Sequence, residues 1–279
     1  MSNEGVKTIS SLKVYEMPKK VIVIGNSCAG KTTFVNMYRS IFDIYDEIDD
    51  IKPLTEVFML DDLIRKNDMN LENIDVKYCK DILKEYVLEK NNINFYTKLS
   101  EKGQGHVILR PVLWEKIVEY SLNACNSDKF IIQLARGKDE SYDDMEKTNA
   151  YEKAFQIMDD KKKLGKDTII VNLKADLKRR IDRNEQRKRN GGHYVDFNTM
   201  NTVYAHDIFQ YDTDKGRDFY DMNGRKLLVY NIENNNILDE NDLKVFMSNN
   251  IINMIKYYNK FKEDVSDGYE KITKRSLSK

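Results

Sequence analysis

The sequence predicts an α/β fold of three layers, in which helices cover both faces of a central parallel sheet. Short runs rich in apolar residues recur along the chain, the first of them fully apolar, and segments with helical spacing separate them. A glycine-rich turn directly follows the first run, at the kind of position where such sheets bind ligands. We place the strands at 21–24, 130–134, 168–173 and 226–230.

Amphipathic helices are expected between these strands. The spacing of apolar residues predicts helices over 32–41, 112–122 and 148–163, one or two more over 71–99, and a C-terminal helix over about 240–263. The stretch 46–62 mixes acidic and apolar residues without a clear period. Residues 1–17 are polar and precede Pro18, so we expect a loosely held arm followed by one domain over 18–279.

Composition excludes several classes of protein. Hydrophobic residues make up 41 % of the chain, and Lys plus Arg equals Asp plus Glu at 46 each, so no net charge attracts nucleic acid or a membrane. The three cysteines lie far apart and support neither a disulfide framework nor a zinc site. No secretion signal and no apolar stretch near ~20 residues is present. We therefore expect a cytoplasmic protein without a membrane partner, of open oligomeric state.

The turn after the first strand matches the phosphate-binding pattern G-x-x-x-x-G-K-[ST] at every fixed position. Its glycines allow backbone N–H groups to point at phosphate oxygens, and the following helix adds a partial positive charge. We expect Lys31 to reach the β- and γ-phosphates and the Thr32 hydroxyl to bind Mg²⁺. The residues expected to hold the nucleotide, ATP or GTP, are Gly25, Asn26, Ser27, Cys28, Ala29, Gly30, Lys31, Thr32 and Thr33.

A basic segment follows the third strand. Arg179, Arg183 and Arg187 recur every four residues and therefore share one face of a helix. Guanidinium groups at the carboxyl end of a strand can bind a γ-phosphate through paired hydrogen bonds. We expect an arginine-rich lid over about 176–200 with a hinge at Gly191 and Gly192. A nucleic-acid contact and a solvated helix face are the alternatives for the same run.

A switch GTPase is disfavoured. The nearest match to its N-K-x-D motif, at 172–176, has one residue too many between Asn172 and Lys174. The D-x-x-G sequence at 221–224 precedes a predicted strand instead of following one.

The order of phosphate loop, strand with Arg136 after it, and arginine-rich segment resembles the nucleoside and nucleotide kinase superfamily of P-loop proteins. More narrowly, the chain is similar to a family of predicted P-loop kinases of unassigned substrate. The resemblance covers about residues 19–235 and depends on segments 111–114, 133–137, 183–187 and 193–195, with Met200 and Tyr204. It implies a nucleotide-kinase-like P-loop fold, a place for Arg136 near substrate or phosphates, and an adenine contact from Asn231 and residues 233–236.

The resemblance also implies a glutamate where this chain has Gln133. A neutral amide neither accepts a proton nor binds Mg²⁺ as a carboxylate does. Asp46 and Glu47 are the preferred replacements. The further candidates are Asp49, Asp50, Asp139, Glu140, Asp143 and Asp144. His193, His206 and Asp207 lack a further ligand, and we do not assign a metal to them.

These features predict a Mg²⁺-dependent phosphotransferase that uses ATP, or GTP, to phosphorylate a small-molecule acceptor, with nucleosides and nucleotides among the candidates. The expected catalytic residues are Lys31, Arg136, Arg179, Arg183, Arg187, Asp46 and Glu47. A kinase acting on nucleic-acid ends is one alternative. A nucleotide-gated interaction module or ATPase is another, and Gln133 favours it. Acceptor pockets follow no spacing rule, so the acceptor stays open.

Overall fold

The computed structural model describes residues 15–43, 45–66, 71–99, 106–137, 150–191, 194–222, 224–236 and 240–264. At its centre lies a seven-stranded sheet of order β2-β5-β1-β6-β9-β8-β7. The parallel strands are β1 (Lys20–Ile24), β2 (Asp46–Asp49), β5 (Phe130–Leu134), β6 (Thr168–Lys174) and β9 (Arg225–Glu233). Two antiparallel strands, β8 (Arg217–Met222) and β7 (Asp212–Asp214), extend one edge. The fold is therefore α/β with a mostly parallel sheet, and the antiparallel edge was not predicted.

Helices connect the strands and cover the sheet. They are α2 (Lys31–Ile41), α3 (Ile51–Arg65), α4 (Lys80–Leu88), α5 (Leu113–Asn123), α6 (Ala150–Asp160), α7 (Leu177–Arg189), α8 (Phe197–Asn201) and α9 (Glu240–Phe261), with the short 3₁₀ helices η2 (Leu71–Asn73) and η4 (Lys262–Asp264). A small hairpin of β3 (Thr97–Leu99) and β4 (His106–Ile108) stands apart from the main sheet. No helix in the described part of the chain is long and apolar enough to cross a bilayer.

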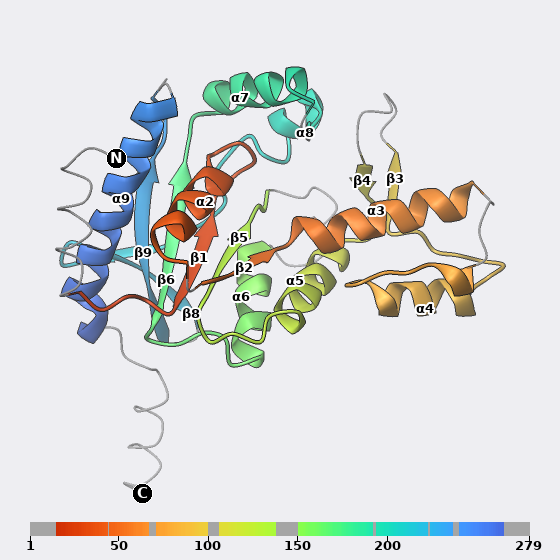
Figure 1. Ribbon diagram of the computed structural model, residues 1–279, viewed down its shortest axis with the longest axis horizontal. Coiled ribbons are helices and arrows are strands. Elements are labelled where there is room, and N and C mark those ends of the chain that lie inside the picture. Colours follow the sequence, from red (N-terminus) through yellow and green to blue (C-terminus); the bar gives the residue numbers. More distant parts are fainter. Residues whose placement is uncertain are drawn as a thin grey trace, which may run out of the picture.

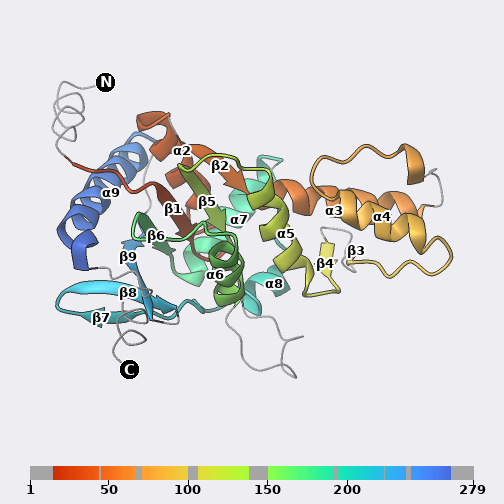
Figure 2. The ribbon, with the colours of Figure 1, turned by 90° about the horizontal axis from the view of Figure 1, so that it is seen from below.

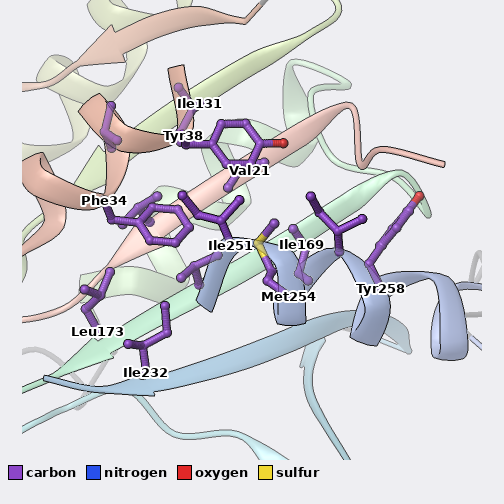
Figure 3. Close-up of a cluster of buried hydrophobic side chains, with 14 of the residues drawn as sticks. Val21, Phe34, Tyr38, Ile131, Ile169, Leu173, Ile232, Ile251, Met254 and Tyr258 are labelled. Atoms are coloured by element: carbon purple, nitrogen blue, oxygen red, sulfur yellow. The ribbon is translucent and has the colours of Figure 1, made fainter. Parts of the chain in front are cut away.

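The alternation of side chains along each strand divides the core into two layers. Val21 and Val23 face α2 and α9, and the close-up in Figure 3 shows Ile251 and Met254 of α9 packed against this face. Ile22 lies on the opposite face, in the cluster that includes α5 and α6. Because both faces are covered, the inner parallel strands β1, β5, β6 and β9 are rich in apolar residues, as the sequence indicates, whereas the edge strand β2 carries Asp46, Glu47 and Asp49.

A third core lies outside the sheet. Residues from α3, α4, the β3–β4 hairpin and α5 form it, including the fully buried Leu60, Ile82 and Tyr96. Figures 1 and 2 show this unit projecting to one side of the sheet. The unassigned stretch 46–62 forms β2 and most of α3, whereas the helix expected over 71–99 exists only over Lys80–Leu88 in α4 and 97–99 is a strand.

The expected N-terminal arm ends in defined contacts. The backbone N–H of Glu16 donates to Asn259 Oδ1 at 3.0 Å, and Asn259 Nδ2 donates back to the Glu16 carbonyl at 2.7 Å. Residues 15–17 are thus tied to α9, while residues 1–14 lie outside the described part of the chain.

The strand order creates a crevice at the carboxyl ends of the strands, between β1 and β5. The chain leaves β1 through α2 toward β2 on one side, and it leaves β5 through α6 toward β6 on the other. A crevice between the carboxyl ends of two such strands is the usual ligand position in a sheet of this type. In Figure 1, α7 and α8 lie above this edge of the sheet.

Candidate functional site

The loop of residues 25–30 joins β1 to α2 in a conformation that requires glycine at both ends. Gly25 has φ 141° and Gly30 has φ 107°. A Cβ atom on Gly25 would lie 2.3 Å from the Leu173 carbonyl oxygen, and one on Gly30 would lie 2.5 Å from Asn234 Nδ2. Both positions disfavour a side chain because of their positive φ, and at Gly25 a clash with backbone also excludes one.

The amino-terminal end of α2 opens from this loop without a side-chain cap. Gly30 occupies the N-cap position, and the first turn of α2 contains no acidic residue. The first N–H groups of a helix have no partner within it and carry a partial positive charge. The end of α2 is thus suited to an anion.

Lys31 points its ammonium group back into the loop. Its Nζ donates to the carbonyl oxygens of Gly25 at 2.7 Å and Asn26 at 2.9 Å. Burial lowers the pKa of Lys31 to about 8, and the nearby Asp50 carboxylate opposes this shift. Among the residues that the structure describes, this buried cation forms no ion pair with a carboxylate, and a bound phosphate would supply the negative charge.

Thr32 and Gln133 meet where α2 begins and β5 ends. The Thr32 hydroxyl donates to Gln133 Oε1 at 3.2 Å. Both residues line one cavity with the Asp50 carboxylate, so three oxygen-bearing side chains are available to Mg²⁺. Among the residues that the structure describes, no three His, Cys, Asp or Glu side chains form a metal-binding group. Mg²⁺ in triphosphate sites usually takes only one or two protein ligands besides phosphates and water, which this set fits.

Two acidic residues line this cavity, Asp182 on α7 beside the arginines and Asp50 directly after β2. Asp46 and Glu47 lie at the other end of β2, where Asp46 pairs with Phe130 at the start of β5. Glu47 forms an ion pair with Arg39 instead. The structure does not bring Asp46 and Glu47 to the site, because β2 carries them to the amino edge of the sheet.

Arg136 fixes Asp50 in place. Its Nη1 donates to Asp50 Oδ2 at 2.8 Å, and the two side chains are only 2 % and 7 % exposed. The guanidinium group also lies over the Trp114 ring, 4.6 Å from its centroid. Burial raises the pKa of Asp50, and Arg136 opposes that shift by favouring the charged carboxylate. Arg136 thus acts on the site through Asp50 and does not itself line the cavity.

Three of the five arginines of α7, namely Arg179, Arg183 and Arg187, line the cavity. Arg179 Nε donates to the Asn235 carbonyl at 3.0 Å. Arg183 donates to the backbone carbonyl of Asn234 at 2.9 Å and to that of Cys28 at 3.4 Å. Arg187 has no hydrogen-bonding partner among the described residues, so its charge is available to a ligand. The four-residue spacing correctly predicted that one face of α7 carries all three.

Two residues that hold the loop were not recognised as such in the sequence. Asn234 Nδ2 donates to the Ala29 carbonyl at 2.8 Å, which ties the segment after β9 to the 25–30 loop. The Tyr151 hydroxyl accepts from the Gly25 N–H at 3.2 Å and from the Arg136 N–H at 3.3 Å. The polar run 233–236 indicated a functional segment that includes Asn234. Nothing in the sequence distinguishes Tyr151 from other aromatic residues of the core.

These groups surround one cavity of about 540 Å³. The 25–30 loop and the start of α2 form its floor. Its lining residues are Ser27, Cys28, Gly30, Lys31, Thr32, Thr33, Asp50, Ile51, Leu54, Trp114, Gln133, Ala135, Arg179, Asp182, Arg183, Gln186, Arg187, Val195, Tyr204, Asn234, Asn236 and Leu243. Gly25, Asn26 and Ala29 belong to the loop but do not line the cavity.

Several other candidates lie away from the site or outside the described residues. Asp139, Glu140, Asp143, Asp144, Gly192 and His193 fall outside the described part of the chain. The His206 carbonyl accepts a hydrogen bond from Asn26 Nδ2 at 3.0 Å, so His206 supports the loop through its backbone.

No protein-family model matches the chain, and no curated protein is significantly similar to it. The resemblance to P-loop kinases therefore stays a prediction, and the functional argument depends on the geometry of the site.

Proposed function

We propose that this protein is a Mg²⁺-dependent phosphotransferase that binds ATP, or GTP, in the 25–30 loop and transfers its γ-phosphoryl group to a small molecule. The observation that carries the proposal is that a single cavity joins three elements. These are a lysine-containing loop at a helix start, a row of arginines on α7, and a second wall from α3 and α5 that holds a buried carboxylate. The second wall favours a kinase, because a nucleotide hydrolase requires no space for an acceptor beside the phosphates.

The triphosphate would lie along the floor of the cavity. Lys31 and the start of α2 offer positive charge to the β- and γ-phosphates, and Arg187 stands opposite with an available guanidinium group. Fixed cations of this kind stabilise charge on a transferring phosphoryl group. Asn236 and Leu243 line the far end, where a nucleoside base would fit.

Mg²⁺ would bind through the Thr32 hydroxyl together with phosphate oxygens, with Gln133 beside it. When bound, the ion neutralises phosphate charge and aligns the reacting groups. Asp50 lies in the same cavity as a candidate proton acceptor for the attacking hydroxyl, held in position by Arg136.

The position of the α7 arginines argues against the alternative that this basic segment contacts nucleic acid. Arg179, Arg183 and Arg187 line the cavity and are not a surface stripe that could follow a nucleic-acid backbone. This favours a lid over a nucleic-acid contact.

The first half of the proposal is that the protein binds a nucleoside triphosphate. Calorimetric titration with a non-hydrolysable ATP or GTP analogue and Mg²⁺ tests it. Lys31→Ala is the variant expected to lose binding. Lys129→Ala, before β5 at the opposite edge of the sheet, is the matched control. Transfer of labelled γ-phosphate to members of a metabolite panel tests the second half. Binding followed only by hydrolysis would overturn the kinase assignment, and no binding would overturn the whole proposal.

A further inference from the structure

The charges that line the cavity are distributed unevenly between its two ends. Among the described lining residues, the cations are Lys31, from the start of α2, and the three arginines of α7. Under the proposed function all four lie on the triphosphate side. The opposite end, toward α3 and α5, is the acceptor end.

The acceptor end is mostly apolar. From the elements that carry them, the start of α3, α5, the residues after β5 and the segment after α8, we assign to this end the lining residues Ile51, Leu54, Trp114, Ala135 and Tyr204 beside Asp50. Asp50 is the charged member of this set. Its charge is already balanced, because Arg136 donates to it at 2.8 Å from a position that is 2 % exposed.

We propose that the phosphate acceptor is an uncharged compound with a hydroxyl group, and not a phosphate monoester. This inference rests on the proposed function and specifies the chemical class of the acceptor molecule. A phosphate monoester would place two negative charges beside Asp50, where the neighbouring Arg136 is already paired with that carboxylate and does not line the cavity. A cationic acceptor would find the carboxylate of Asp50 already paired with Arg136.

An uncharged compound with a hydroxyl group can form favourable contacts with both the polar and the apolar residues of the acceptor end. The acceptor hydroxyl can donate to the Asp50 carboxylate, while Trp114 and Leu54 cover a flat or apolar face of the molecule. In the transfer step the hydroxyl oxygen bonds to the γ-phosphorus and the bond from that phosphorus to the β-phosphate oxygen breaks. Asp50 takes the hydroxyl proton and later releases it to water. The products are a phosphate monoester, a nucleoside diphosphate and one proton.

Trp114 offers a specific probe, because it is the only tryptophan in the chain and lines the acceptor end. The full-length protein is first loaded with Mg²⁺ and a non-hydrolysable ATP analogue. Ribose, inositol and thymidine are then titrated against its fluorescence, each beside its own phosphate monoester. We expect a saturable change with at least one uncharged compound and a response at least about tenfold weaker for its monoester, a difference of about 1.4 kcal/mol.

The outcomes separate the two proposals. Tighter binding of the monoesters, or no response to any uncharged compound while the analogue binds, overturns this inference and leaves triphosphate binding intact. Failure of the analogue itself to bind overturns the proposed function.

A variant that adds a positive charge to the acceptor end gives a second test. Leu54→Arg adds a cation to the acceptor end and is expected to increase the response to the monoesters at least about tenfold. Leu88→Arg, on the exposed surface of α4, is the matched control and is expected to leave the response unchanged. Circular dichroism checks that both variants fold. Equal responses of the two variants would show that charge at this end does not select the acceptor.

Discussion

Asp50 and Arg136 lie 86 residues apart in the sequence and form an ion pair of 2.8 Å in the interior of the protein. The pair joins the end of β2 to the residue after Ala135, and so fixes the carboxylate relative to the 25–30 loop. Removal of one partner from a buried pair leaves an uncompensated charge and commonly costs about 3–5 kcal/mol.

We therefore expect Arg136→Met to lower the free energy of unfolding by about 3 kcal/mol or more. Arg39→Met is the matched control, because Arg39 is 43 % exposed and its pair with Glu47 should contribute about 0–1 kcal/mol. Urea denaturation of both variants gives the comparison. Similar losses in the two variants would contradict a special role for the buried pair.

Triphosphate binding should depend on pH through Lys31. Burial lowers its pKa to about 8 in the empty protein, so the ammonium loses its proton as pH rises through that value. Affinity should therefore be highest below pH 8 and fall above it. Because a bound phosphate favours the charged lysine, we expect proton uptake on binding near pH 8.

Calorimetry in buffers of different ionisation enthalpy measures this proton uptake. Lys31→Arg provides the control, since its guanidinium group stays charged and should remove the pH dependence. In the empty protein the same group makes stability rise with pH between about 8 and 10.5, because the unfolded chain binds more protons there. Equal affinity on both sides of pH 8 would contradict the assignment.

Gln133→Glu should strengthen the binding of a divalent ion. The substitution places a carboxylate at the position 3.2 Å from the Thr32 hydroxyl, where the amide oxygen now lies. With a non-hydrolysable triphosphate bound, we expect Mn²⁺ affinity to increase about tenfold, since a charged ligand attracts the ion more strongly. Electron paramagnetic resonance titration measures free Mn²⁺ directly. Gln210→Glu, an exposed position outside the cavity, should show no change.

The arginines of α7 should differ in their effects. Arg187 has no described hydrogen-bonding partner, so Arg187→Met should leave stability almost unchanged and reduce kcat by about 10³ or more. Arg183 holds the carbonyls of Cys28 and Asn234, so Arg183→Met should lower both stability and triphosphate affinity. Arg189→Met, exposed at the end of α7, is the control. Equal loss of stability in the Arg187 and Arg183 variants would contradict this division.

Gly25→Ala should prevent the 25–30 loop from keeping its conformation. The new Cβ would lie 2.3 Å from the carbonyl oxygen of Leu173, a backbone atom of the central strand β6. Gly224 also has positive φ but open space around its position, so Gly224→Ala isolates the conformational part of the cost, about 1 kcal/mol. We expect Gly25→Ala to cost at least twice as much in thermal unfolding. An equal cost would mean that the loop moves freely away from Leu173.

The parts of the fold that sequence reasoning found are those encoded by contiguous residues. Residues 21–24 of β1 form an unbroken apolar run, β5 is apolar except for Gln133, and the helical spacing of α2, α5 and α9 repeats over several turns. The antiparallel strands β7 and β8 were missed because β7 has only three residues, all polar and exposed, and β8 mixes charged residues with the buried Phe219, Tyr220 and Met222. The helix expected over 71–99 was overextended, because its apolar residues pack in a separate core with α3 and α5.

The sequence by itself determined the strands β1, β5, β6 and β9, the 25–30 loop and the shared face of Arg179, Arg183 and Arg187, since each depends on the local period or on one turn. Only the tertiary structure decided that Asp50, and not Asp46 or Glu47, lies in the cavity, because this follows from the register of β2 against β5. It likewise brought Trp114 and Asn234 to the site from distant elements. Strand order and register depend on contacts between residues far apart in the chain, and a short stretch of sequence does not encode these contacts.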